Sequence, residues 1–211
     1  MLWDIIGLSL RVSLSALFFA LLLGLPIALL ITVKNFPGRS LLQVVIDSFM
    51  ALPPVVVGLI VYLLLSRDGP LGLWGLLYTP SAMIIAQTLL ITPLVIALSL
   101  QVFDTHWRAL GQQLWMLGYR PLQCFGLMLY EARSGLATVA LAAFGRAIAE
   151  IGAVMIVGGN IEHHTRVMTT AIATETRQGN LSLALALGLI LMVLALVINA
   201  FVHFFKPRAE R

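Results

Sequence analysis

Charged residues are scarce in this chain of 211 residues: Asp, Glu, Lys and Arg together make up 10% of it. Soluble globular domains carry about 25%. Hydrophobic residues reach 60%, and the mean hydropathy is +1.01. A chain with this few charges would expose large apolar patches in water. The composition therefore excludes an ordinary soluble domain and indicates a membrane protein.

Cysteine is almost absent as well. The single Cys124 allows no internal disulfide and fits no metal-ligand spacing, and the adjacent His163 and His164 point to different faces of the chain. We therefore expect no metal site. The net charge is +4, but the basic residues stand at the ends of apolar runs, which is typical of membrane topology. We expect no nucleic-acid partner.

The signatures of several enzyme classes are missing too. The only lysines, Lys34 and Lys206, precede Asn35 and Pro207, so the Gly-Lys-Ser/Thr of a phosphate-binding loop does not occur. The chain also lacks H-E-x-x-H, a G-x-S-x-G nucleophile turn and paired intramembrane carboxylates. An intramembrane enzyme is therefore disfavoured. We assign no catalytic residue and expect no cofactor bound by this chain.

Five apolar runs are long enough to cross the hydrocarbon core as helices, which takes about 20 residues. They are continuous rather than alternating, which excludes transmembrane β-strands, and the first is too long for a signal-peptide core. The expected spans cover residues 12–33, 41–65, 81–103, 135–157 and 181–205. The sequence thus predicts an all-α membrane protein with one transmembrane domain over residues 1–211.

The basic residues between these spans predict the orientation. Eight of them fall on one side and four on the other. The side richer in Lys and Arg faces the cytoplasm, which places the N-terminus outside and the C-terminus inside. The eight are Lys34, Arg39, Arg108, Arg120, Arg133, Lys206, Arg208 and Arg211; the four are Arg11, Arg67, Arg166 and Arg177.

Proline interrupts three of the expected spans, at Pro26, at Pro53-Pro54 and at Pro93. Each removes a backbone donor and kinks its helix. In lipid such a break persists where neighbouring helices or a water-filled path satisfy the freed carbonyls. Ordinary kinked packing accounts for any single one of them. The consecutive Pro53 and Pro54 favour a bent helix that faces a translocation pathway.

The fourth run contains the only oppositely charged pair at membrane depth. Arg146 is its twelfth residue of 23, and Glu150 follows four residues later, one helical turn and about 6 Å along the axis. A charge at that depth costs about 2.5–3.5 kcal/mol on insertion scales. Two interpretations stay open: a structural ion pair that fixes the rotation of the helix, or the polar lining of a solute path.

A polar segment at 158–180 is expected on the outer side. Its side chains are either solvated loop residues or the mouth that receives a polar or anionic solute. The residues that would form such a mouth are Asn160, Thr165, Arg166, Thr169 and Thr170.

Between the third and fourth runs lies a polar stretch, residues 104–133, which we call the coupling segment. It is far longer than a connection between two spans requires. Apolar residues recur in its first half at helical spacings of three and four, and Gly118 with Pro121 predicts a turn into a second helix. We expect a helix–turn–helix on the cytoplasmic membrane surface that is bound by a partner. An interfacial helix without a partner is the alternative. The apolar stripe is Phe103, Trp107, Leu110, Leu114 and Leu117.

This segment resembles the cytoplasmic coupling loop of ABC importer permeases, whose motif is E-A-A followed by a glycine and an Ile-x-Leu-Pro tail. In register on Gly118, residues 112–114 (QQL) occupy the E-A-A positions, and the acidic residue and the proline of the motif are missing. Residues 51–72, 143–161 and 165–191 resemble the tungstate-type branch of the molybdate/tungstate permeases, and the resemblance covers nearly the whole chain.

The resemblance implies about five transmembrane helices in the type I ABC importer permease (MetI-like) fold, located in the prokaryotic inner membrane. It also implies two copies of the permease, two cytoplasmic ABC ATPase subunits that use ATP and Mg, and an extracytoplasmic oxyanion-binding protein. The implied contacts to the ATPase are Trp107, Arg108, Leu110, Gln112, Gln113, Leu114, Leu117 and Gly118.

We therefore expect the permease subunit of an ATP-driven oxyanion importer that works by alternating access. Tungstate is the first candidate, with molybdate or sulfate as alternatives within the family. An ATP-independent carrier or channel is the alternative outside it. The candidates for the pathway, or for a structural ion pair within it, are Pro53, Pro54, Arg146, Glu150, Asn160, Thr169 and Thr170.

Overall fold

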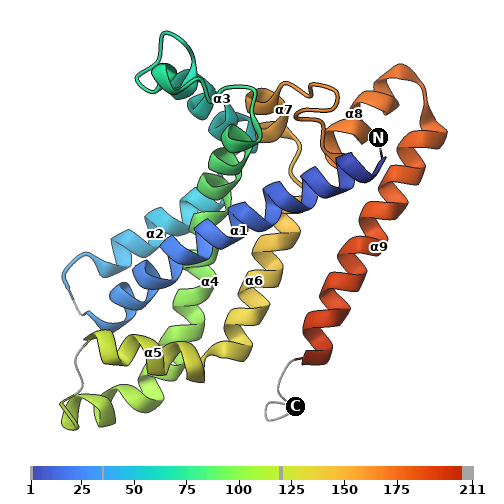
Figure 1. Ribbon diagram of the computed structural model, residues 1–211. Coiled ribbons are helices and arrows are strands. Elements are labelled where there is room, and N and C mark those ends of the chain that lie inside the picture. The colour runs from blue at the N-terminus through green and yellow to red at the C-terminus, as the bar shows by residue number, and fades with distance from the viewer. Residues whose placement is uncertain (1, 35, 119–120, 206–211) are drawn as a thin grey trace.

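The computed structural model describes residues 2–34, 36–118 and 121–205, and every regular element in those ranges is a helix (Figure 1). The all-α prediction is confirmed. Three helices are each long and apolar enough to cross a membrane: α1 (Leu2–Val33), α4 (Pro80–Met116) and α9 (Leu181–Phe205). Two bent helix pairs raise the number of candidate spans to five.

Helix α1 packs along α4 through small side chains. Ala16 and Ala20 are fully buried, and a Cβ on Gly24 would lie only 2.7 Å from Cγ1 of Val95. Small residues let two backbones approach closely, which is how helices associate where lipid supplies no hydrophobic driving force. Helix α6 (Arg133–Ile148) joins this contact through Val139, Ala143 and Ala147, and the three helices form the centre of the bundle.

The expected span 41–65 is two helices rather than one bent helix. Helix α2 (Arg39–Met50) and helix α3 (Pro54–Leu65) meet at 93°, with the break at residues 51–53. Pro53 is extended, with φ −62° and ψ 127°, because a residue that precedes proline is driven out of the helical region. Pro54 then occupies the first turn of α3, where its missing N–H costs no hydrogen bond.

The expected continuous helix over 135–157 is wrong. Helix α6 ends at Ile148, and a separate short helix, α7 (Gly152–Gly158), begins after residues 149–151. The Glu150 side chain accepts a hydrogen bond from the backbone N–H of Ala153 at 3.2 Å. A carboxylate in that position satisfies one of the free N–H groups at the start of a helix. Glu150, the residue before the N-cap Ile151, therefore stabilises the start of α7.

The coupling segment also differs from the expectation in its first half. Helix α4 runs without a break from the third span to Met116, so this half continues the span instead of forming a separate surface helix. The predicted turn is present: Gly118 has φ +70°, and helix α5 (Pro121–Glu131) follows it. At Ala132 the chain bends by 77° into α6.

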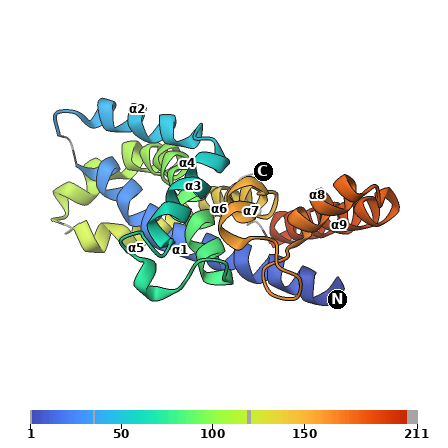
Figure 2. The ribbon, with the colours of Figure 1, turned by 90° about the horizontal axis from the view of Figure 1, so that it is seen from above.

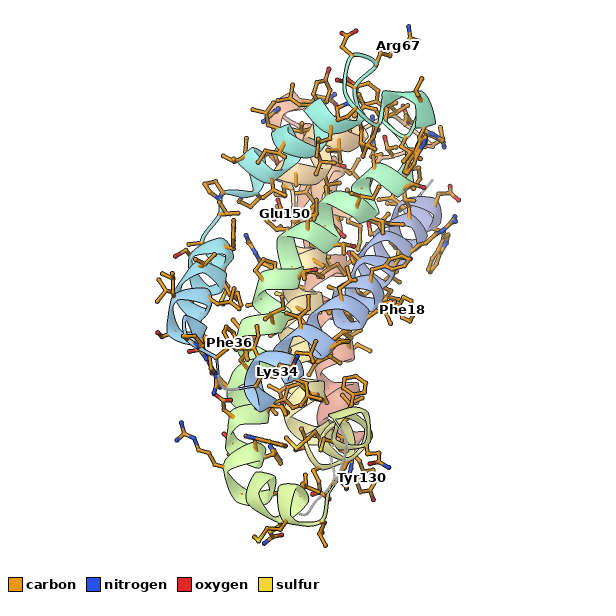
Figure 3. All side chains as sticks on the ribbon, turned by 90° about the vertical axis from the view of Figure 1, so that its left-hand side faces the viewer. Phe18, Lys34, Phe36, Arg67, Tyr130 and Glu150 are labelled. Carbon is orange, nitrogen blue, oxygen red and sulfur yellow. The ribbon has the colours of Figure 1, made fainter. Side chains whose placement is uncertain are left out.

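The remaining elements lie at the two ends of the bundle and along one side of it. A 3₁₀ turn, η1 (Gly72–Trp74), and helix α8 (Met168–Gln178) lie at the end that also holds α3 and α7, whereas α5 lies at the opposite end (Figure 1). Helix α9 stands to one side with α8 (Figure 2), and 11% of its most apolar window is buried. Figure 3 shows Lys34 and Tyr130 toward one end of the molecule and Arg67 at the other.

Candidate functional site

The two helix breaks face each other. A Cβ on Gly58 of α3 would lie 2.7 Å from the Cα of Ala153 in α7, closer than real Cβ atoms approach a backbone atom. A Cβ on Gly152 would lie 3.0 Å from Cγ2 of Val55. The first turns of α3 and α7 are thus in backbone contact, and the interrupted parts of two expected spans form one structural unit, which we call the paired breaks (residues 51–58 and 149–153).

Glu150 is buried at the centre of this unit. Its residue is 4% exposed, its backbone carbonyl accepts a hydrogen bond from Oγ1 of Thr169 at 2.9 Å, and its side chain caps α7. Figure 3 shows Glu150 between the end marked by Arg67 and the end marked by Tyr130. A buried carboxylate needs such partners because its transfer out of water is costly.

The charged groups of Arg146 and Glu150 lie farther apart than two residues one turn apart on a helix could place them. Its Nη2 lies 4.0 Å from Oε2 of Glu150, at the outer limit of an ion pair, and its side chain is 43% exposed. The helix ends between the two residues, so this long ion pair spans the end of α6 instead of lying along one helix face. The carboxylate is held inside the protein, while the guanidinium remains accessible from one face of this single chain.

Gln87 of α4 also contacts the paired breaks, although it is not among the residues predicted from the sequence. Its Nε2 donates a hydrogen bond to the carbonyl oxygen of Ala147 at 2.9 Å, and the backbone N–H of Glu150 donates to the same oxygen at 3.2 Å. Oε1 of Gln87 and Oγ1 of Thr88 are buried and have no hydrogen-bond partner among the described residues. A side-chain amide in the middle of an apolar run is costly in lipid, so Gln87 could have been predicted as a functional residue from the sequence.

The polar residues expected at an outer mouth hold the outer segment together. Nδ2 of Asn160, a residue with φ +49°, donates to Oγ1 of Thr174 at 2.8 Å. Thr170 is buried, and its hydroxyl donates to the carbonyl of Val167 at 3.0 Å and accepts from the N–H of the same residue. With the bond from Thr169 to Glu150, these contacts tie residues 158–174 to the paired breaks. Their part in receiving a solute stays a prediction.

The coupling segment divides into a packed face and an exposed tip. Phe103 is fully buried in a cluster with Met128 of α5 and Leu136 of α6, and Trp107 packs against that cluster. Leu114 is buried, and Leu110 is partly buried. Most of the apolar stripe is therefore covered by the chain itself, and the exception, Leu117, lies at the tip of the segment.

At the tip, Met116 is 80% exposed and Leu117 is 73% exposed. Arg108, Gln113 and Gly118 are also exposed, whereas the side chain of Gln112 lies outside what the structure describes. Two large apolar side chains at a polar turn form a surface that a protein partner could cover. The structure thus separates residues of this segment that pack internally from residues that are free to meet a partner.

Comparison with known proteins decides the class. A family model described as the binding-protein-dependent transport system inner membrane component matches residues 20–211. The chain belongs to this family. The resemblance noted in the sequence is therefore confirmed, and this member of the family is a multi-pass membrane permease.

Named relatives match nearly the full length of this permease. It is 43% identical over 210 residues to a probable anion ABC transporter permease of Haloferax volcanii, covering 97% of this chain and 90% of that protein. It is 42% identical over 201 residues to a tungstate uptake system permease of Peptoclostridium acidaminophilum, covering 95% and 88%. A molybdenum transport system permease of Escherichia coli is 30% identical over 210 residues, covering 92% and 89%.

Among the described residues of this permease, no group of three or more His, Cys, Asp or Glu side chains could hold a metal ion. The paired breaks and the exposed tip of the coupling segment are its two candidate functional sites. One lies in the interior, and the other lies at the end that carries α5.

Proposed function

We propose that this chain is the permease subunit of an ATP-driven importer for an oxyanion, and that the oxyanion is tungstate. The observation that carries the proposal is the pattern of identities among relatives. Two tungstate uptake permeases are 42% and 38% identical to it, over 95% and 82% of the chain. Sulfate and molybdenum permeases are 30% identical. Molybdate and sulfate remain the alternative substrates.

The importer would contain two copies of this permease, two cytoplasmic ATPase subunits and an extracytoplasmic oxyanion-binding protein. Because the chain has no phosphate-binding loop, the ATPases would bind ATP and Mg. The binding protein would supply most of the selectivity, since it captures the anion before the permease meets it. The distribution of basic residues supports an N-terminus outside and a C-terminus in the cytoplasm.

The exposed tip of the coupling segment would dock on the ATPase. Met116 and Leu117 supply apolar contact, and Arg108 and Gln113 supply polar contact. At the first E-A-A position, Gln112 can form hydrogen bonds but lacks the charge for an ion pair with an ATPase arginine. Because α4 continues unbroken from the tip into the membrane, a movement of the tip would reach the spans directly.

The paired breaks would respond to that movement by bending. Irregular backbone at membrane depth is tolerated where it lies inside protein or lines a water-filled cavity. The two breaks are natural hinges for alternating access. The backbone hydrogen bonds of α2 and α6 reach only to Leu52 and Glu150, and those of α3 and α7 begin at Pro53 and Ile151. The half-exposed Arg146 would attract a passing anion, whereas the carboxylate of Glu150 stays turned into the protein.

Purification of the tagged chain tests the proposal. A P-loop ATPase should be recovered with the permease, and an oxyanion-loaded binding protein should stimulate ATP hydrolysis by the reconstituted complex. Anion flux through the chain alone would support the ATP-independent carrier or channel instead. Competition among tungstate, molybdate and sulfate for the binding protein would then identify the substrate.

A further inference from the structure

An ion pair joins the coupling segment to a distant part of the fold. Nη2 of Arg39, the first residue of α2, lies 2.7 Å from Oδ1 of Asp104, the first residue of the coupling segment. The two residues are 65 positions apart, and their side chains are 26% and 27% exposed. Gly38, with φ +95°, turns the chain immediately before α2. Because the pair is partly buried, dissolved salt screens its attraction less than that of an ion pair at the surface.

Asp104 moves with the docking surface because both lie on one helix. It stands one turn before Arg108, and α4 continues without a break to Met116. Arg39 and Asp104 line a cavity of about 450 Å³ together with Trp107 and Arg108. A shift of the tip along or about the axis of α4 would therefore displace the carboxylate of Asp104 by a similar amount.

Helix α2 packs along α4 with few buried side chains of its own. Ile46 is the one buried residue of the helix, and apolar side chains such as Leu41 and Val44 are exposed. Nε of Arg39 is buried and has no hydrogen-bond partner among the described residues. Loss of Asp104 would leave a partly buried guanidinium without its ionic partner, which is strongly unfavourable. Among the described residues, this ion pair is the one side-chain hydrogen bond between α2 and α4.

The other end of α2 leads to the paired breaks. Beyond Met50 the chain turns by 93° into α3, whose backbone at Gly58 lies against Ala153 of α7. Helices α2 and α3 therefore form a bent connection between the coupling segment and the break at Glu150. A pull on Arg39 would rotate α2 and change the angle at residues 51–53.

We propose that Arg39 and Asp104 are positioning residues that transmit movement of the coupling segment through α2 and α3 to the paired breaks. This rests on the proposed function, because it assumes an ATPase that moves the coupling segment. The proposal differs from docking itself, since neither residue needs to touch the ATPase. It also differs from simple stabilisation, because loss of the pair should uncouple ATP hydrolysis from transport within an assembled complex.

The first test is a charge exchange in the complete complex reconstituted in lipid vesicles. Arg39→Asp and Asp104→Arg should each leave ATPase binding and basal ATP hydrolysis intact, while anion uptake per ATP falls about tenfold, a size typical of the coupling between two distant sites. The double variant should recover most of that loss. Ser48→Ala, whose hydroxyl bonds only the carbonyl of Val44 in α2, is the matched control and should stay coupled.

The second test uses one protein sample and so is independent of folding differences. Arg39→Cys with Asp104→Cys, in a Cys124→Ala background, should be uncoupled until a bifunctional thiol reagent of matching length links the two sites. Recovery of uptake per ATP after linking supports the proposal. Unchanged coupling in the single variants, no recovery in the exchange, or no effect of linking would overturn it. Absence of ATP hydrolysis in the parent complex would instead refute the proposed function.

Discussion

Gly58 of α3 and Ala153 of α7 are in direct backbone contact, so close that a Cβ on the glycine would lie 2.7 Å from the Cα of the alanine. This contact joins the break after Met50 to the break after Ile148. Two expected spans that are distant in sequence therefore share one irregular region in the interior.

Gly58→Ala should destabilise the permease, because the added methyl group meets a backbone atom rather than a flexible side chain. Overpacking of this kind costs about 1–3 kcal/mol. Thermal unfolding in detergent should show a lower Tm. Gly7→Ala is the control, since its Cβ would meet nothing within 4 Å and alanine favours a helix. Equal Tm values for the two variants would show that α3 and α7 are not in contact.

Glu150→Ala should weaken the start of α7, because Ala153 loses its side-chain acceptor. Loss of such a cap costs about 0.5–2 kcal/mol. Glu150→Gln keeps an oxygen in the same position and should retain most of the stability. Hydrogen exchange at the amide of Ala153 measures the difference. Faster exchange in both variants would mean that the negative charge, rather than the acceptor atom, starts the helix.

Arg146→Ala should reduce anion uptake in a correctly assembled complex, since a half-exposed cation near the paired breaks would attract the passing oxyanion. Arg146→Lys keeps the charge and should retain part of the activity. The measurement is initial uptake rate, with assembly checked by size-exclusion chromatography. If Arg146→Ala loses only assembly, Arg146 has the structural role that the sequence left open.

Gly118→Val should abolish uptake while the chain still inserts into the membrane. Gly118 has φ +70°, a conformation that costs about 1–2 kcal/mol for residues with a Cβ. Gly118→Asn is the matched control, because asparagine tolerates the left-handed region. Uptake assays and membrane fractionation test both variants. Full activity of Gly118→Val would exclude a role for this turn in docking.

Local signals accounted for much of the fold. Hydropathy and run length indicated the membrane-spanning helices, and Pro53 with Pro54 marked the break between α2 and α3, although a 93° turn exceeds the bend we expected. Gly118 marked the turn before α5. The continuity of α4 could also have been predicted, because residues 104–116 contain no proline and a single interior glycine, Gly111, is tolerated in a helix. Only their polar composition suggested a separate helix.

The break at Glu150 could not be predicted from local signals in the sequence. The sequence from Ala147 to Ala153 contains no proline and favours a helix. What ends the helix is distant: Gln87 binds the carbonyl of Ala147, and Thr169 binds the carbonyl of Glu150. The pairing of Arg39 with Asp104 is likewise a tertiary contact, and a single sequence does not show which charges meet across 65 residues.

Tungstate uptake by vesicles that contain the complete complex tests the proposed function. We expect accumulation that requires ATP, the ATPase and the oxyanion-binding protein together. We also expect that unlabelled tungstate suppresses accumulation at lower concentrations than molybdate or sulfate. Accumulation by the permease alone, without ATP or an ATPase, would contradict the proposed function.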